Sequence, residues 1–111
     1  MPKSAVQTSQ LIVRASLADI ADRNKFDRWY ETEHLPDALK AFKARRAWRG
    51  WSQTNPLVHF AFYEFASVAE AQAIHSSPAL TALIAEFDRT WGRRVARTRE
   101  VIEITSTLES I

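Results

Sequence analysis

The sequence predicts one α+β domain with the element order β-α-β-β-α-β. Residues alternate with a period of two at 9–17, 57–65 and 95–105, which is the pattern of strands. Large apolar residues recur instead at helical spacing at 26–34 and 78–91. A fourth strand is expected before 57–65. This order is the ferredoxin-like arrangement, an antiparallel four-stranded sheet with both helices on one face.

The composition is that of an average globular domain. Of the 111 residues, 46% are hydrophobic and 25% are charged, and the net charge is +2. This charge is too small to indicate a nucleic-acid tail, and no stretch has the length of a membrane span. The polar start lacks the apolar region of a signal peptide, so we expect a cytoplasmic protein. We expect a flexible arm at 1–8, one domain at 9–105 and a tail at 106–111.

The first strand has one apolar face and one mixed face. Its apolar face comprises Leu11, Val13, Ala15 and Leu17, and its mixed face comprises Ile12, Arg14 and Ser16. Asp19 or Asp22 is expected to cap the helix that follows, because an aspartate side chain accepts a hydrogen bond from the first helical N–H groups.

That helix carries the densest mixture of aromatic, acidic and imidazole groups in the chain. At about 100° per residue, five side chains fall on one face about 140° wide. They are Phe26, Trp29, Tyr30, Glu33 and His34. Glu33 takes a position where a core residue is expected, and His34 lies toward the rim. Because Pro36 disfavours α geometry at Leu35, we expect the helix to break there and 37–42 to form a short further turn.

The stretch 44–54 is expected to form the second strand, although a helix up to Arg49 is an alternative. Trp48 and Trp51 favour a strand, but their spacing of three is wrong for one face. A bulge at Gly50 would restore both indoles to one side. In the third strand, both faces are largely apolar: Val58, Phe60, Phe62 and Glu64 on one, and Leu57, His59, Ala61, Tyr63 and Phe65 on the other.

The second half of the chain contains clear signals for helix ends. Ser67 opens a short helix through a capping box with Glu70, and Ser77 and Pro78 restart it. Gly92 is expected to end it before the last strand, 95–105. The apolar residues repeated along the second helix are interpreted as core: Leu80, Leu83, Ile84, Phe87 and Trp91.

Two helices on one face leave the other face of the sheet bare. An apolar sheet face is not stable when it is exposed to water. In so short a chain, a second copy of the same sheet is the simplest cover. The sequence therefore predicts a homodimer.

The chain resembles the dimeric α+β barrel superfamily, most closely its EthD-like branch. The main marker is W-Y-x-x-E-H-L-P, which runs from Trp29 to Pro36. A second, more general marker is H-F-A-F-Y-E-F-A-S-V-A-E-A, at 59–71. The resemblance covers 9–105 and implies a dimer whose sheets close into a barrel, with a ligand cavity between each sheet and its helices.

The resemblance implies a small cofactor-independent enzyme that acts on an aromatic or polyketide-like molecule. Monooxygenase, cyclase and lyase chemistry stay open, because one fold supports many reactions. The branch's helix histidine corresponds to His34, whereas a strand histidine of other members corresponds only loosely to His59. Two alternatives remain: a non-catalytic small-molecule-binding or stress-related homodimer, and a structural dimer with a filled core.

Tyr30 and His34 are the candidate catalytic pair, since side chains four apart on a helix can meet. His34 would transfer a proton and Tyr30 would donate to a developing oxyanion, with Glu33 or Asp37 orienting the imidazole. The alternative is that His34 caps the helix C-terminus. The residues expected to contact the substrate are Trp29, Glu33, Arg14, Trp51, His59 and Tyr63, with Arg14 meeting a ligand carboxylate if its face lines the cavity.

We expect neither a metal nor another cofactor. His34, His59 and His75 lie on separate elements without short ligand spacing, and two glycines do not make a phosphate loop. Two basic runs, at 40–49 and 93–99, are interpreted as a solvated face or as ion pairs at a dimer interface. We expect no nucleic-acid partner and no membrane partner.

Overall fold

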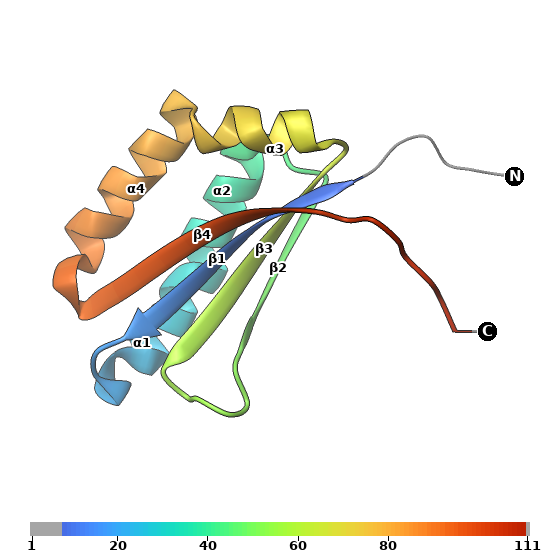
Figure 1. Ribbon diagram of the computed structural model, residues 1–111. Helices are drawn as coiled ribbons and strands as arrows, with labels where there is room; N and C mark the ends of the chain where they lie inside the picture. Colours follow the sequence, from blue (N-terminus) through green and yellow to red (C-terminus); the bar gives the residue numbers. More distant parts are fainter. Residues whose placement is uncertain (1–7, 111) are drawn as a thin grey trace, which may run out of the picture.

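A computed structural model of the protein describes residues 8–110 and confirms the predicted α+β fold (Figure 1). The four strands form one antiparallel sheet in the order β2-β3-β1-β4. Their bounds are Ser9–Leu17 (β1), Arg46–Trp51 (β2), Val58–Phe65 (β3) and Val95–Glu103 (β4). The last strand ends two residues earlier than predicted, and 104–110 have no regular structure. Except for Thr8, the predicted N-terminal arm lies outside the described residues.

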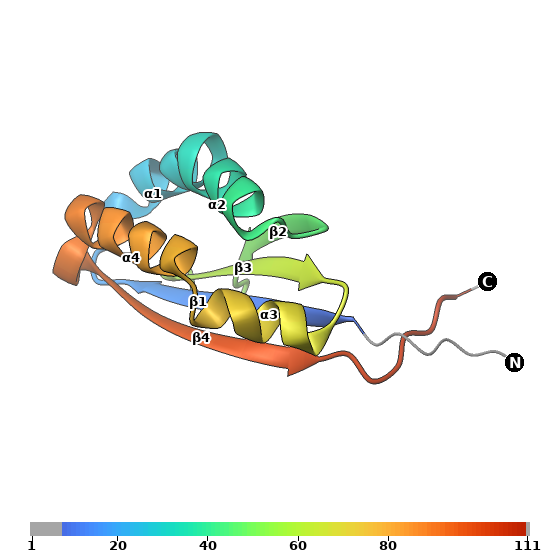
Figure 2. The same ribbon diagram turned by 90° about the horizontal axis from the view of Figure 1, so that it is seen from above.

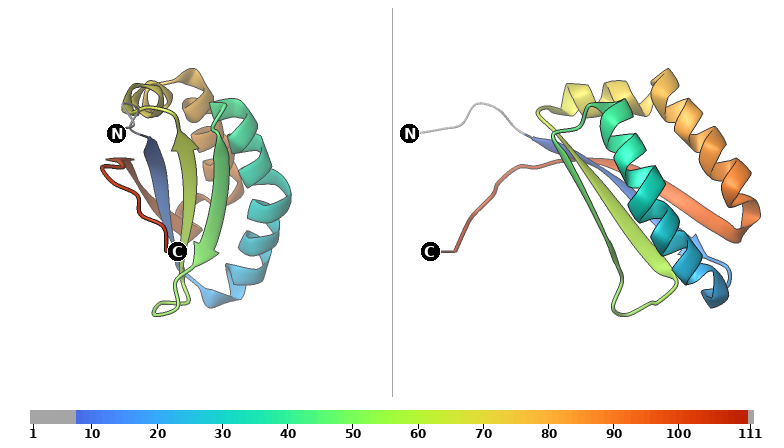
Figure 3. Two further views of the ribbon diagram at one scale, coloured as in Figure 1. Left: turned by 90° about the vertical axis from the view of Figure 1, so that its right-hand side faces the viewer. Right: turned by 180° about the vertical axis from the view of Figure 1, so that it is seen from behind.

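The helices cover one face of this sheet. Figure 2 shows α1, α2 and α4 on the same side of the strands, and the two views of Figure 3 agree. The helices are α1 (Arg23–Trp29), α2 (Leu35–Phe42), α3 (Val68–His75) and α4 (Pro78–Thr90), with 3₁₀ turns at Ile20–Asp22 and Gly92–Arg94. Among residues 8–110, no helix is long and apolar enough to cross a bilayer.

The serine caps and the glycine end predicted for the second half of the chain are confirmed. The Ser67 hydroxyl accepts a hydrogen bond from the Glu70 N–H at 3.2 Å. Ser77 does the same for the Leu80 N–H, also at 3.2 Å. Gly92 has a positive φ of 54° after the end of α4, a conformation that glycine adopts without steric cost.

The predicted division of β1 and β3 into two faces is also confirmed. Odd-numbered residues of both strands face the helices and are buried, except half-buried Leu57, which precedes β3. The second helix contributes to the same core as expected, with Leu80, Phe87 and Trp91 buried and Leu83 and Ile84 half-buried. Both faces of the sheet are apolar, but the helices cover only one.

The predicted bulge at Gly50 is wrong, and so is the helical alternative for this stretch. β2 pairs with β3 in unbroken register, with Trp48 opposite Phe62 and Trp51 opposite His59. The spacing of three therefore places the two indoles on opposite faces. Trp48 stacks on Phe62 on the open face, at 5.4 Å between ring centroids, whereas Trp51 packs under the helices.

The predicted break at Leu35 is wrong as well. The chain stays helical through Pro36, because Tyr30–His34 forms a π-helical segment between α1 and α2. The Leu35 N–H reaches the Tyr30 carbonyl, five residues back. A proline has no N–H and clashes with the carbonyl four residues before it, and the wider turn relieves this conflict. The extra residue in the turn rotates Glu33 out to solvent and His34 into the core.

Candidate functional site

His34 lies in the core at the end of the π-helical segment. It is 7% exposed and stacks on Trp29, with 4.7 Å between ring centroids and 19° between ring planes. The Tyr30 ring meets it edge-on at 4.9 Å. Because the helix continues past it, His34 does not cap a helix end, and its predicted place at the rim is wrong.

A small cavity opens beside His34, between the helices and the sheet. Its volume is about 20 Å³, enough for about one water molecule. Apolar side chains from β1, α2 and α4 form most of its wall. The polar groups that line it are Tyr30, His34, Tyr63, Arg97 and Arg99.

The imidazole of His34 is neutral at neutral pH. Burial, followed by the charges of Arg97 and Arg99, lowers the pKa of His34 to about 4. Its Nδ1 is buried without a hydrogen-bond partner among the described residues. A buried polar atom of this kind costs free energy unless a ligand or a water satisfies it. His34 therefore borders the cavity as a neutral imidazole with one unsatisfied ring nitrogen.

Two tyrosines line the same cavity as this imidazole. Burial raises the pKa of Tyr30 to about 12, and burial together with Tyr30 raises that of Tyr63 well above its usual range. The Tyr30 and Tyr63 hydroxyls form a hydrogen bond with each other, and either one can be the donor. Both side chains are neutral hydrogen-bond donors at physiological pH, and Tyr30 is suited to binding a developing oxyanion.

The sequence analysis did not assign Arg97 and Arg99 to the site. Both lie on the helix-facing side of β4, opposite Ala15 and Val13 of β1. Arg97 bonds to the Asp88 carboxylate at 2.7 Å, and its guanidinium lies 3.7 Å from the centre of the Phe87 ring. The alternation of β4 indicates this orientation, because Arg97 and Arg99 are odd-numbered, as are the inward-facing Val95 and Val101.

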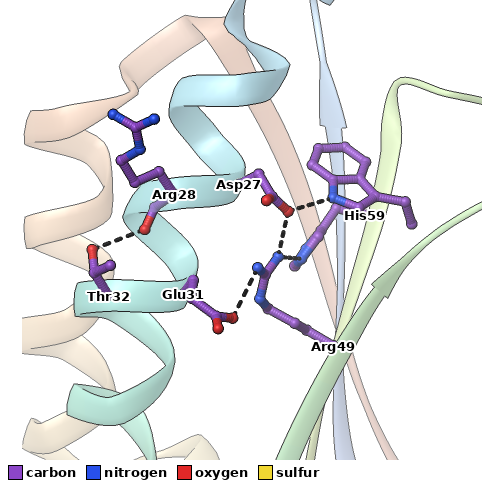
Figure 4. A network of polar contacts seen from close by, with 7 residues as sticks. Asp27, Arg28, Glu31, Thr32, Arg49 and His59 are labelled. Carbon is purple, nitrogen blue, oxygen red and sulfur yellow. Dashed lines mark hydrogen bonds and ion pairs between the residues drawn. The ribbon is translucent and has the colours of Figure 1, made fainter.

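His59 and Trp51, both expected to bind substrate, belong to a separate network (Figure 4). The Arg49 guanidinium contacts His59 Nε2 at 3.2 Å and Asp27 at 2.9 Å, and the Trp51 indole N–H donates to Asp27 at 2.8 Å. The Arg49 guanidinium also donates a hydrogen bond to the Glu31 carboxylate at 3.1 Å. His59 is fully buried. The network links the first helix to β2 and β3, and neither His59 nor Trp51 lines the cavity.

The other predicted substrate contacts lie away from the cavity. Arg14 is exposed on the open sheet face, which does not line the cavity. Glu33 and Asp37 are exposed and make no hydrogen bond to His34 within the described part of the chain. The Trp29 ring stacks on the His34 ring, and Trp29 also lines a surface groove together with Glu33. In residues 8–110, no three histidine, cysteine or acidic residues gather as metal ligands would.

We expect the free energy of unfolding to fall as the pH drops from about 7 to about 4.5. Burial lowers the pKa of His34 to about 4 and that of His59 to about 3, so below pH 6.5 the unfolded chain binds more protons than the folded one. Each histidine should cost about 2 kcal/mol at the acidic end, at about 1.4 kcal/mol per pKa unit. Urea unfolding across this range measures the loss.

The matched variants for this experiment are His34→Gln and His75→Gln. His75→Gln serves as the reference for the substitution itself, because His75 is exposed. His34→Gln should remove about half of the loss, because it removes one of two buried titrating groups. An unchanged pH dependence in His34→Gln would show that His34 is not buried in neutral form.

Comparison with known proteins identifies the fold. No family model and no curated protein matches the sequence. Solved structures match over most of their length. One is an ethyl tert-butyl ether D (EthD) family protein from Bacillus halodurans, with 14% identity, a TM-score of 0.64 and coverage of 84% of this chain and 96% of that one.

Two further solved structures have the same fold. A cofactor-independent oxygenase, SnoaB from Streptomyces nogalater, is 9% identical with a TM-score of 0.60, over 93% of this chain and 98% of that one. A dimeric ferredoxin-like protein from an uncultured marine organism is 14% identical with a TM-score of 0.55, over 92% and 99%. The chain therefore has the fold of the dimeric ferredoxin-like proteins, which confirms the predicted structural resemblance.

Proposed function

We propose that the protein is a cytoplasmic, homodimeric, cofactor-independent enzyme that acts on a small aromatic or polyketide-like molecule. The substrate binds between the sheet and the helices, and His34 transfers the proton. The reaction class stays open among monooxygenase, cyclase and lyase chemistry. The alternative is a non-catalytic homodimer that binds a similar molecule.

The proposal rests mainly on the protonation and hydrogen bonding of His34. A neutral imidazole with an unpartnered Nδ1 lines a cavity that also contains the Tyr30 hydroxyl. The imidazole can accept a proton from an acidic C–H or O–H group, and Tyr30 can donate to the oxyanion that forms. The shared fold of the cofactor-independent oxygenase SnoaB supports the reaction class.

A substrate of this class needs more room than the cavity offers. Ligand sites usually enclose about 300–1,000 Å³, against about 20 Å³ here. Leu83 and Ile84 of α4 line the cavity and are only half-buried. We expect these two side chains to move outward when the ligand enters.

A screen of aromatic and polyketide-like compounds tests the proposal. We expect at least one compound to raise the melting temperature, because a ligand that binds only the folded state stabilises it. Product analysis without any added cofactor should then show conversion of that compound. A compound that binds without conversion would favour the non-catalytic alternative, and the absence of any ligand would favour a structural dimer.

The open face of the sheet supports the homodimer. Its central row consists of Trp48, Phe62 and Ile12, which are cross-strand neighbours. Phe60 extends the aromatic surface, at 6.3 Å from the Phe62 ring. These side chains are only partly covered, and an apolar surface of this kind is typical of an interface.

We expect the protein to sediment as a dimer at low micromolar concentration. Phe62→Asp should yield a folded monomer, because it places a charge at the centre of the apolar row. Ile20→Asp is the matched control, since Ile20 is an exposed apolar residue outside the sheet. Sedimentation equilibrium measures all three masses, and a monomer mass for the unmodified protein would exclude the barrel dimer.

A further inference from the structure

The cavity next to His34 is lined by positive and neutral polar groups only. Arg97 and Arg99 approach it from β4, Tyr30 and His34 from the π-helical segment, and Tyr63 from β3. No carboxylate of residues 8–110 lines it. Both arginines lower the pKa of His34 through their charge, so the cavity interior is electropositive.

The two arginines differ in what neutralises them. Arg97 is held by Asp88 at 2.7 Å, and its side chain is 11% exposed. Arg99 forms no ion pair and no side-chain hydrogen bond with any described residue, although it is half-buried. A guanidinium that has lost part of its hydration without gaining a partner is costly. It is also ready to bind an anion through two parallel N–H groups.

Arg99 lines both the cavity and an open surface groove of about 350 Å³. The groove runs between α3 and β4 and is also lined by Gln72, His75, Glu100 and Val101. A ligand that enters through this groove meets the Arg99 guanidinium before it reaches His34. Its apolar part can then advance toward the rings of Phe42 and Phe87, which line the cavity.

We propose that the site selects an organic anion, an aromatic carboxylate or an ionised enol, whose charged oxygen is bound by Arg99. This inference rests on the proposed function and narrows its substrate class. Arg99 is the specificity-determining residue. The charge of Arg97 is balanced by Asp88, so Arg99 is the arginine that offers an unbalanced positive charge, and His34 lines the same cavity.

A matched pair of probes tests the charge selection. We would measure the binding of 2-naphthoate and of its neutral isostere 2-naphthamide by fluorescence titration. The His34 ring resonances in NMR spectra report whether the probe enters this cavity. A hydrogen bond to a charged group contributes about 1.5–3 kcal/mol, so the acid should bind about 10- to 100-fold more tightly than the amide.

Arg99→Gln should reduce this preference to within about 3-fold, a change of less than 1 kcal/mol. Arg93→Gln is the matched control, since Arg93 is exposed in the Gly92–Arg94 turn outside the sheet, and should keep the full preference. An undiminished preference in Arg99→Gln, or equal binding of acid and amide to the unmodified protein, would overturn the inference. Binding of neither probe would overturn the small-molecule site as well.

Salt dependence adds a test that needs no variant. Salt screens the attraction between an anion and a guanidinium. The Kd of 2-naphthoate for the unmodified protein should therefore rise several-fold between about 0.02 and 0.5 M sodium chloride, and that of 2-naphthamide should not. A salt-independent Kd for 2-naphthoate would contradict charge selection.

Discussion

His34→Gln is expected to lower turnover by about 10²–10⁴-fold for any compound that the unmodified protein converts. Glutamine keeps similar size and some hydrogen bonding, but it cannot take up or release a proton at physiological pH. The imidazole lines the cavity, and its buried Nδ1 has no partner among the described residues. Product formation under saturating substrate measures the effect.

The loss should appear in the chemical step and not in binding. His34→Gln should stay folded by circular dichroism and should bind the compound with a Kd within about 10-fold of the original. Leu108→Ala is the control, because Leu108 is 95% exposed and lines neither the cavity nor the groove beside Arg99. Equal conversion by His34→Gln and the unmodified protein would show that His34 is not the catalytic group.

Trp91→Ala is expected to reduce the free energy of unfolding by about 3–5 kcal/mol. The indole is 5% exposed, and its ring lies 5.2 Å from Phe26 and 5.9 Å from Trp29. Its N–H has no partner among the described residues, so the loss comes from packing and not from a hydrogen bond. Urea unfolding at one fixed protein concentration measures it, since the stability of a dimer depends on concentration.

Two further variants serve as comparisons for the stability loss expected in Trp91→Ala. Leu108→Ala should change stability by less than about 0.5 kcal/mol, because Leu108 is 95% exposed. His34→Gln should cost clearly less than Trp91→Ala, since His34 borders a cavity on one side. If His34→Gln cost as much as Trp91→Ala, His34 would be a structural residue.

The candidate site was only partly predictable from sequence. The contact between Tyr30 and His34 was predictable, because a spacing of four brings side chains together on a helix. The polar residues around them were mostly misplaced, since Glu33 is exposed, Arg14 lies on the other sheet face and His59 bonds to Arg49. Each of these errors concerns which groups meet across elements, and residue spacing within one element does not contain that information.

The π-helical segment shows why the positions of Glu33 and His34 could not be predicted from their spacing. Regular α geometry places Glu33 inside and His34 at the rim, and Pro36 argues for a break. The helix instead widens by one residue at Tyr30–His34, which keeps it continuous and reverses the positions of the two side chains. The choice between a break and a wider turn depends on the packing of Tyr30 and His34 against the core, which is a tertiary interaction.

The sequence by itself determined the strands, the second helix, its caps and the burial of β1 and β3, because periodicity and capping are local and act through neighbouring residues. Tertiary structure decided the path of the first helix, the regular register of β2 and the role of the arginines of β4. A guanidinium is paired or free according to which carboxylates the fold brings near it. Asp88 reaches Arg97 and no described carboxylate reaches Arg99, and only the assembled sheet and helices set that difference.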